Sequence, residues 1–196
     1  MNLSLPSLDE LNALEFIDLF PYITWHENKK FFDLEAGKEH YRLLAHLSLQ
    51  FPKGHKFLDV GTYTGMSAIA LAYNRVCKVV SFDLHSILPN DTINPHHRSN
   101  TEFRIENILS NLSEHLKECK CIFLDTNHDG EFEHQFYKAL VEHDYKGILL
   151  LDDIHLNEPM EIFWKSITHK KIDLSKLGHW SGTGAVIFDS TVIDLA

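Results

Sequence analysis

Apolar and polar residues follow one another along the chain in a pattern that predicts strands and helices in alternation. Short apolar runs, such as residues 148–151, show no period-two alternation with polar side chains, as expected of parallel strands covered on both faces. Between these runs, apolar residues recur with the spacing of amphipathic helices. The predicted strands are 56–60, 78–82, 101–105, 120–124 and 147–151, and the predicted helices are 65–74, 110–118, 131–142 and 158–168.

The segments that flank this alternating region carry other signals. Ser7 and Glu10 have the spacing of a capping box, which predicts a helix that begins there and runs to about Phe20, before Pro21. A second helix is predicted over 35–50. The remaining segments are expected to be an aromatic stretch without a clear period (23–33), an irregular loop (84–99) and two closing strands (172–174 and 184–189) around a turn-rich stretch.

Strands joined through helices by right-handed crossovers form a doubly wound sheet. The predicted fold is therefore α/β: a Rossmann-like doubly wound, mostly parallel seven-stranded sheet with an antiparallel C-terminal strand. With 196 residues, of which 44% are hydrophobic, the chain is long enough to bury one core and does not have the composition of a disordered protein. We expect a single domain over 1–196, in which 1–34 form a helical and aromatic cover segment and 35–196 the core.

Charge and cysteine content narrow the classes of partner. Asp and Glu number 28 against 18 Lys and Arg, a formal net charge of −10, and no basic stripe is present to neutralise phosphates. This balance disfavours a nucleic-acid partner and fits a protein that binds a small molecule or a cation. The 3 cysteines, none in a C-x-x-C pair, fit neither a disulfide framework nor a zinc site. Cys119 and Cys121 have the spacing of residues on the same face of a strand, and we expect both in the core.

Three observations bear on location. The cysteine usage indicates a reducing compartment. Residues 1–7 have no basic region followed by an apolar one, and no apolar run approaches 18 residues. We therefore expect no signal peptide, no membrane partner and a cytoplasmic location. The sequence leaves open whether the protein forms a homo-oligomer.

The stretch 57–72 combines a short apolar run, two glycines and a helical pattern, which predict a buried strand, a tight loop and the first turn of a helix. Gly61 and Gly65 would allow positive φ and the close approach of a ligand, because no Cβ stands in the way. The helix would direct free N–H groups at whatever lies over the loop. Asp59 and Ser67 stand two residues outside the glycines. An ordinary strand-to-helix turn would have the same pattern.

Acidic residues end several of the predicted strands. Asp83, Asp125 and the pair Asp152 and Asp153 end the second, fourth and fifth strands. They should therefore lie at the edge of the sheet where doubly wound folds bind ligands. Asp83, which comes 22 residues after Gly61, is placed to accept hydrogen bonds from ribose hydroxyls.

Tyr63 bears on which nucleotide fits the loop. It stands where the dinucleotide-binding pattern G-x-G-x-x-G has a glycine beside the pyrophosphate, and a bulky side chain there obstructs a diphosphate. A ligand without a diphosphate, such as S-adenosylmethionine, is tolerated. Asn107, just past the third strand, is a candidate for contact with the adenine, although a solvated loop residue is an equally good interpretation.

A second group of polar residues consists of Asp125, His128, Asp152 and Asp153. Carboxylates that converge on one point repel one another unless a cation neutralises them, and hard oxygen ligands favour magnesium, manganese or calcium over zinc. His128, three residues after Asp125, would reach a substrate held by that metal. A single Asp or His at such a position is more often a solvated residue at the end of a loop, but the four residues together favour a functional site.

The run Gly61-Thr62-Tyr63-Thr64-Gly65-Met66-Ser67-Ala68 resembles the nucleotide-binding loop of class I S-adenosylmethionine-dependent methyltransferases, in particular that of catechol-type O-methyltransferases. Asp125-x-x-His128 followed by the acidic pair is similar to the macrocin O-methyltransferase type, in which the acids hold magnesium and the histidine is the base. The resemblance therefore implies a role for three sets of residues. The cofactor-binding residues would be Asp59, Gly61, Thr62, Tyr63, Gly65, Ser67, Asp83, Asn107 and Asp125. The metal ligands would be Asp125, Asp152 and Asp153, and the catalytic residue would be His128.

The activity that this resemblance implies is S-adenosylmethionine-dependent O-methylation of a hydroxyl on a small molecule. Residues 35–196 would bind the cofactor, a divalent metal, magnesium above all, would assist, and His128 would be the base. Two other classes stay open: a non-catalytic protein of the same fold that binds S-adenosylmethionine or another nucleotide, and a nicotinamide-dependent oxidoreductase, which Tyr63 disfavours. Trp25, His40 and Tyr41 could close over the cofactor, but packing in the core is the expectation for all three.

Overall fold

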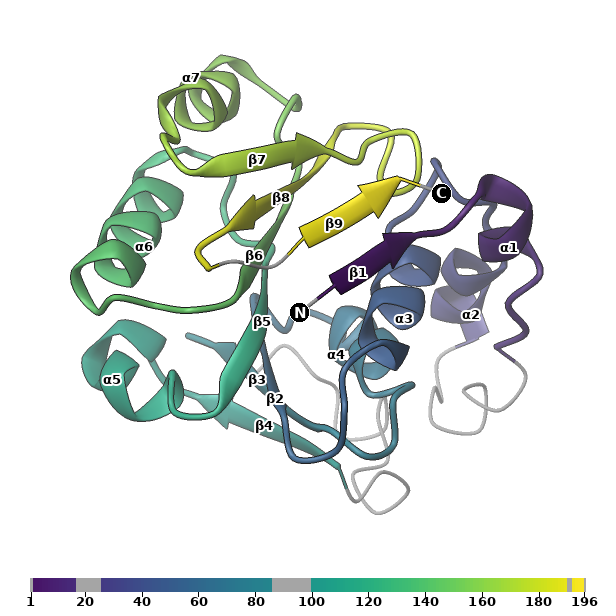
Figure 1. Cartoon of the computed structure of the whole chain (residues 1–196), viewed down its shortest axis with the longest axis horizontal. Helices are drawn as coiled ribbons and strands as arrows, with labels where there is room; N and C mark the ends of the chain where they lie inside the picture. Colours follow the sequence, from purple (N-terminus) through teal and green to yellow (C-terminus); the bar gives the residue numbers. More distant parts are fainter. Residues whose placement is uncertain (1, 17–25, 86–99, 190–191, 196) are drawn as a thin grey trace.

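The computed structural model describes residues 2–16, 26–85, 100–189 and 192–195. Within them the main feature is a seven-stranded sheet with the strand order β4-β3-β2-β5-β6-β8-β7 (Figure 1). Neighbouring strands from β4 to β6 pair in parallel, whereas β8 runs antiparallel to both β6 and β7. The predicted fold class is thus confirmed. The strands are β2 (Lys56–Val60), β3 (Lys78–Asp83), β4 (Thr101–Ile105), β5 (Cys119–Leu124), β6 (Ile148–Asp152), β7 (Lys170–Asp173) and β8 (Thr183–Ile187).

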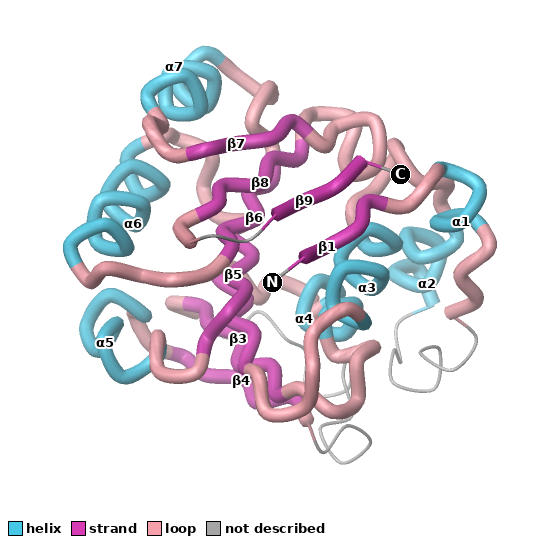
Figure 2. The backbone as a smooth tube through the Cα atoms, viewed as in Figure 1, coloured by secondary structure: helices cyan, strands magenta, loops and turns pink. Residues whose placement is uncertain are grey.

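Helices cover both faces of this sheet (Figures 1 and 2). On one face α3 and α4 pack against the strands, and α1 and α2 contact α3; on the other face lie α5, α6 and α7. Each face carries its own apolar cluster, as expected of a sheet buried on both sides. No described helix is long and apolar enough to cross a membrane. The helices are α1 (Leu8–Asn12), α2 (His26–Asp33), α3 (Tyr41–Leu49), α4 (Met66–Leu71), α5 (Leu112–His115), α6 (Glu131–Glu142) and α7 (Glu158–Ser166).

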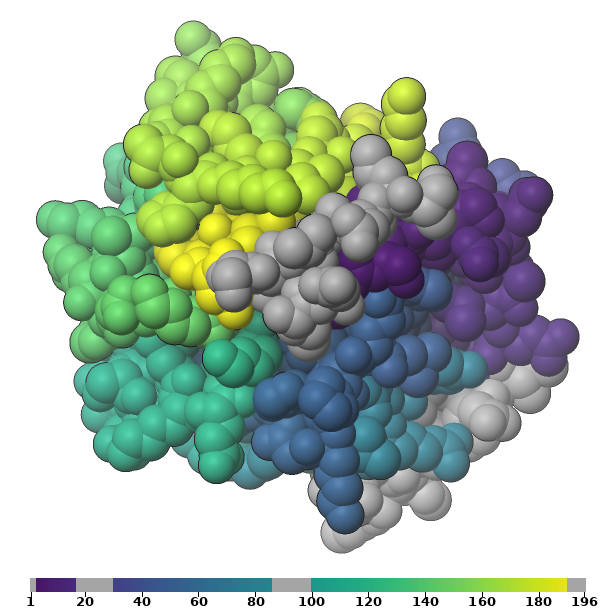
Figure 3. Space-filling view, viewed as in Figure 1, coloured from purple at the N-terminus to yellow at the C-terminus, as the bar shows by residue number. Residues whose placement is uncertain are grey.

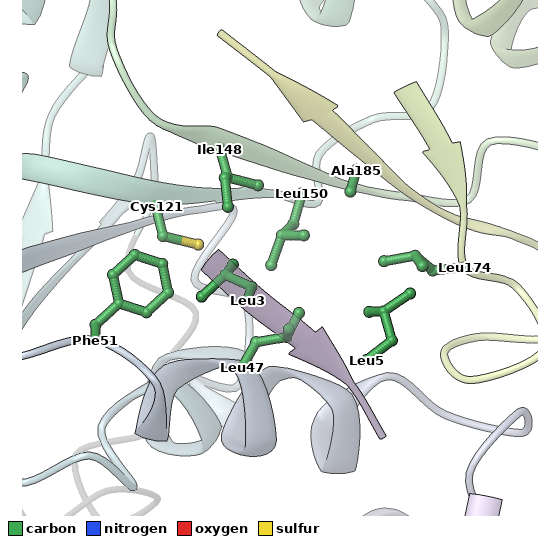
Figure 4. A pocket seen from close by; sticks show the side chains of 9 residues that line it. All are labelled: Leu3, Leu5, Leu47, Phe51, Cys121, Ile148, Leu150, Leu174 and Ala185. Atoms are coloured by element: carbon green, nitrogen blue, oxygen red, sulfur yellow. The ribbon is translucent and has the colours of Figure 1, made fainter. Parts of the chain in front are cut away.

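A second, two-stranded sheet was not predicted. Strand β1 (Asn2–Leu5) pairs in parallel with β9 (Val192–Leu195), so the two ends of the chain lie side by side. Leu3 and Leu5 of β1 point into the core between α3 and the large sheet (Figure 4). The apolar cavity that they line has a volume of only about 10 Å³, enough for at most one water molecule. In the space-filling view, purple residues from the N-terminal part of the chain and yellow residues that precede residue 190 are visible on the same face (Figure 3).

The first helix is shorter than predicted. The capping box is present: the Glu10 backbone N–H donates to Ser7 Oγ at 3.2 Å, and the Ser7 N–H donates to Glu10 Oε2 at 2.8 Å. The helix nevertheless ends at Asn12 rather than near Phe20, because the Arg42 guanidinium donates to the carbonyls of Leu11 and Leu14 and so satisfies groups that a longer helix would bond internally. Residues 17–25, which include Trp25, lie outside the described residues.

Other boundaries also differ from the prediction. Helix α3 begins at Tyr41 instead of residue 35, and α5 has one turn preceded by a 3₁₀ segment (Ile108–Asn111). Most of the predicted loop 84–99 lies outside the described residues. Cys119 and Cys121 are both buried but belong to the clusters on opposite faces, not to one face, because the pairing of β5 with β2 shifts register between them.

Candidate active site

A cavity of about 530 Å³ opens at the carboxyl ends of β2, β3, β4 and β5, where a doubly wound fold binds its ligand. This volume is in the range of small-molecule and cofactor sites. Apolar walls come from residues such as Phe82, Ile108 and Phe132, none of which was predicted to belong to the site. The predicted site residues that line the cavity are Gly61, Tyr63, Asp83, Asn107, Asp125 and His128.

Gly61 lies where the loop after β2 meets the end of β5. Its φ is +102°, and a Cβ built on it would lie 1.6 Å from the carbonyl oxygen of Asp125. The side chain is therefore excluded by the neighbouring backbone, whether or not a ligand approaches. Gly65, with φ of +75°, starts α4 in a left-handed conformation that favours glycine.

The other residues predicted around this loop lie beneath it, outside the cavity. Asp59 is fully buried, and its Oδ2 accepts from Ser81 Oγ at 2.5 Å. Thr62 Oγ1 lies 2.6 Å from the same hydroxyl, and the buried Ser67 hydroxyl also bonds the Asp59 carboxyl. Burial raises the pKa of Asp59 to about 7 despite these hydrogen bonds. Asp59, Thr62 and Ser67 thus hold the loop in shape from below.

Asp83 and Asn107 face the cavity from β3 and from the segment after β4. The Asp83 carboxylate accepts from the backbone N–H of Tyr63 at 3.0 Å and of His85 at 3.2 Å, which fixes it at the rim. The Asn107 Oδ1 accepts from the Leu109 N–H at 3.0 Å and caps the 3₁₀ segment. Both side chains are therefore held in place at the edge of the cavity by hydrogen bonds to local backbone.

His128 lies at the junction of the cavity and the acidic residues. Its Nε2 is 3.2 Å from Asp125 Oδ1 and 3.4 Å from Asp153 Oδ2. The residue has φ of +55°, which is uncommon for a side chain other than glycine and is found often at functional sites. Glu133 and Asn157 hold this backbone: Glu133 Oε1 accepts from the His128 N–H at 3.2 Å, and Asn157 Nδ2 donates to the His128 carbonyl at 2.8 Å.

Neither Glu133 nor Asn157 was predicted to belong to the site. Glu133 is in the first turn of α6. An acid at this position is usually exposed to solvent and interacts favourably with the helix dipole, yet Glu133 is only 1% exposed. Asn157 has the pattern of an N-cap and does cap α7, with its Oδ1 accepting from the Met160 N–H at 3.0 Å. The sequence signals only these helix-terminus roles, and the contacts with His128 arise from the fold.

Two further histidines join the acidic residues. His40, expected to pack in the core, is 2% exposed and does contact Phe123, but its Nδ1 is 3.3 Å from Asp152 Oδ1 and 3.2 Å from Glu39 Oε1. His179, from the turn before β8, places Nδ1 3.1 Å from Asp153 Oδ1 and 3.4 Å from Asp152 Oδ2. We refer to Glu39, His40, Asp125, His128, Asp152, Asp153 and His179 as the His–Asp cluster.

The carboxylates of the cluster raise the pKa values of His40 and His179. Burial alone would lower the pKa of His40, but the Asp152 carboxylate and then Glu39 raise it to about 9. Burial would likewise lower the pKa of His179, yet hydrogen bonds to Asp152 and Asp153 raise it to about 10. The pKa of Asp125 is raised by its own burial. Imidazolium groups therefore already offset part of the carboxylate repulsion that the sequence pattern assigned to a metal alone.

The donor atoms of the cluster fit a divalent cation. Three groups of residues each bring one ligand atom within 4.8 Å of the others: Glu39, His40 and His179; His40, Asp125 and Asp152; and Asp152, Asp153 and His179. Each group contains at least one histidine, and none of them unites the three predicted metal ligands Asp125, Asp152 and Asp153. Among the described residues, Asp152 Oδ1 and both ring nitrogens of His40 are buried without a hydrogen-bond partner, which is rare for polar atoms without a ligand.

No protein-family model and no curated protein sequence matches the chain. Solved structures do. The SAH-bound methyltransferase PaMTH1 of Podospora anserina aligns with 15% identity and a TM-score of 0.52 over 75% of this chain and 76% of that one. A candidate caffeoyl-CoA O-methyltransferase from Staphylococcus aureus aligns with 13% identity and a TM-score of 0.55 over 93% and 92%.

A candidate SAM-dependent methyltransferase from Streptococcus mutans aligns with 12% identity and a TM-score of 0.51 over 74% of this chain, which spans 48% of that protein. At sequence identities this low, the alignments show that the folds are alike and say nothing of the reaction. The chain therefore has the Rossmann-like fold of these methyltransferases, with a ligand-sized cavity at the carboxyl edge of its sheet.

Proposed function

We propose that the protein is an S-adenosylmethionine-dependent O-methyltransferase that acts on a hydroxyl group of a small molecule, with His128 as the general base and a divalent cation at the His–Asp cluster. The observation that carries the proposal is the junction between the two parts of the site. Asp125 and His128 line the cofactor-sized cavity and also belong to the cluster. A methyl group delivered from the cavity would therefore meet an acceptor hydroxyl next to His128.

The cavity residues suit an adenosine-containing ligand without a diphosphate. Asp83 offers a carboxylate to the ribose hydroxyls at the end of β3, and Asn107 and the apolar walls lie where an adenine would pack. Tyr63 lines the cavity from the loop after β2, where a dinucleotide-binding loop has a glycine beside the pyrophosphate, so a bulky side chain there disfavours a diphosphate. Asp59, Thr62 and Ser67 contribute by holding that loop, as their buried hydrogen bonds indicate.

The chemistry requires a proton to leave the acceptor hydroxyl as the oxygen attacks the methyl carbon. S-adenosylmethionine, when bound, supplies a methyl group on a positively charged sulfur. His128 accepts the proton at Nδ1, which has no hydrogen-bond partner among the described residues, while Nε2 keeps its proton toward the carboxylates of Asp125 and Asp153. Those carboxylates stabilise the imidazolium that forms. Glu133 and Asn157 keep the ring in place through the backbone of His128, because they bond its N–H and its carbonyl.

The cation would be held by Asp152 together with the donors on either side of it, Asp125 with His40 or Asp153 with His179. A bound cation lowers the pKa of a hydroxyl group that it contacts and fixes its position. The net charge of −10 makes a nucleic acid an unsuitable acceptor, so we place the acceptor among small molecules.

Calorimetric titration tests this function against its alternatives. We expect S-adenosylmethionine and S-adenosylhomocysteine to bind one per chain and NAD not to bind. A screen of catechols, sugars and other hydroxylated compounds with labelled S-adenosylmethionine should then yield a methylated product. Binding of NAD in place of S-adenosylmethionine would contradict the proposal and favour an oxidoreductase. Tight S-adenosylhomocysteine binding without transfer to any compound of the panel would favour a non-catalytic binder.

A further inference from the structure

The carboxylate of Asp152 lies between two imidazole rings. His40, at the start of α3, places Nδ1 3.3 Å from Oδ1, and His179, from the turn before β8, places Nδ1 3.4 Å from Oδ2. The two histidines come from segments 139 residues apart in the chain, which the fold brings together at the end of β6. The two rings differ in how far their nitrogens are already satisfied.

His179 is satisfied by the protein. Its Nδ1 lies 2.9 Å from Ser181 Oγ and 3.1 Å from Asp153 Oδ1. His40 is satisfied only in part: its Nδ1 lies 3.2 Å from Glu39 Oε1 and 3.3 Å from Asp152 Oδ1, but neither ring nitrogen makes a hydrogen bond with the described residues, and the residue is 2% exposed. Asp152 is 3% exposed, and its Oδ1, the atom that faces His40, is unpartnered as well. Buried polar atoms of this kind are usually bonded to protein, water or an ion.

Asp125 completes this arrangement. Ligand atoms of His40, Asp125 and Asp152 lie within 4.8 Å of one another, the spacing that a shared cation requires. Asp125 also lines the cavity, so an ion in this group would lie at the edge of the ligand space. A site of one imidazole nitrogen and two carboxylates differs in chemistry from a site of carboxylates alone. Magnesium prefers oxygen ligands and retains its waters, whereas an imidazole favours iron, cobalt, nickel and zinc.

We propose that the neutral imidazole of His40, together with Asp125 and Asp152, binds a first-row transition-metal ion of the iron(II), cobalt(II), nickel(II) and zinc(II) class, and that His40 selects such an ion over magnesium. Binding releases to solvent the proton that His40 holds in the metal-free cluster. His179 positions Asp152 and Asp153 from the other side through the contacts above. A role of the ion in methyl transfer rests on the proposed function, but its binding does not.

Cobalt(II) and magnesium titrations of chelator-treated protein test the assignment without an activity assay. We expect one cobalt per chain, bound at least about tenfold more tightly than magnesium. His40→Gln should weaken cobalt about tenfold or more and change magnesium much less. His155→Gln is the matched control, because that histidine also pairs with an aspartate, Asp173 at 2.8 Å, but at the surface and outside the cluster; it should leave both affinities unchanged.

Anomalous diffraction at the cobalt edge from the wild-type protein locates the ion even if His40→Gln does not fold. A peak within bonding distance of a His40 ring nitrogen supports the proposal. A peak elsewhere, or no cobalt binding, would overturn it. It would also be overturned if the protein bound cobalt and magnesium equally well and His40→Gln changed neither affinity. Titration of the same samples with S-adenosylhomocysteine separates the two claims. Nucleotide binding without cobalt binding rejects the metal site alone, and cobalt at His40 without nucleotide binding rejects the proposed function alone.

Discussion

Asp59 should make the stability of the protein depend on pH in a way that one substitution can isolate. Its carboxyl group is fully buried, and burial raises its pKa to about 7 from the value of 3.8 expected in an unfolded chain. Because the folded pKa lies above the unfolded one, the contribution to stability is fully present below pH 3.8. It is lost as the pH rises through 7. A shift of about 3 pKa units corresponds to about 4 kcal/mol in total.

Asp59→Asn removes this titration and keeps an oxygen that can accept from Ser81 Oγ. Urea unfolding of the two proteins at pH 5 and pH 8 gives the free energy of unfolding in each case. Between these pH values the wild type should lose about 3 kcal/mol relative to the variant, while titration of the groups that do not interact with Asp59 cancels in the comparison. If the difference between the two proteins is the same at pH 5 and pH 8, Asp59 is not a carboxyl group with a raised pKa, and the argument from its burial fails.

Three further substitutions test the loop, the ribose contact and the support of His128. Gly61→Ala should destabilise the fold by about 3 kcal/mol or more in thermal or urea unfolding, because of the clash with the Asp125 carbonyl. Gly54→Ala shares the positive φ, +94°, but has open space around its Cβ, and should be much milder. Asp83→Ala should weaken S-adenosylhomocysteine by about 1–3 kcal/mol in calorimetry, and equal affinities would remove the ribose assignment. Asn157→Ala should lower the rate of methyl transfer while nucleotide affinity is kept; Ser7→Ala, which removes only a helix cap, should leave the rate unchanged.

The large sheet could be predicted from the sequence because its signals are local. The local sequence pattern predicts β2 and β4 with their observed bounds, and the apolar periodicity predicts α6 over Glu131–Glu142, as found. The pairing of β1 with β9 joins residues from the two ends of the chain, and four-residue strands carry too short a pattern to be recognised. The bulge opposite Lys56 turns Cys119 and Cys121 to opposite faces, which their spacing alone could not indicate.

The predicted residues that line the cavity lie at the ends of strands or in the loops that follow them. Asp83, Asp125 and Asp152 are recognisable because the ends of parallel strands meet at one edge of a sheet. His40 and His179 were not recognised, because a histidine at a helix start or in a turn has no signal until topology brings it to a carboxylate. The expectation that the acids hold a metal came from their mutual repulsion and from the resemblance to the macrocin O-methyltransferase type. Neither argument took the imidazoles of His40 and His179 into account, and these offset part of the repulsion.

Transfer of a labelled methyl group from S-adenosylmethionine, compared between the wild type and His128→Ala, tests the central claim most directly. The wild type should methylate a hydroxyl compound from the panel. His128→Ala should bind S-adenosylhomocysteine with nearly unchanged affinity and transfer the methyl group about 10²–10⁴-fold more slowly, the usual contribution of a general base. Undiminished transfer by His128→Ala, or loss of nucleotide binding along with activity, would contradict the role of His128 as the base at the junction of the cavity and the His–Asp cluster.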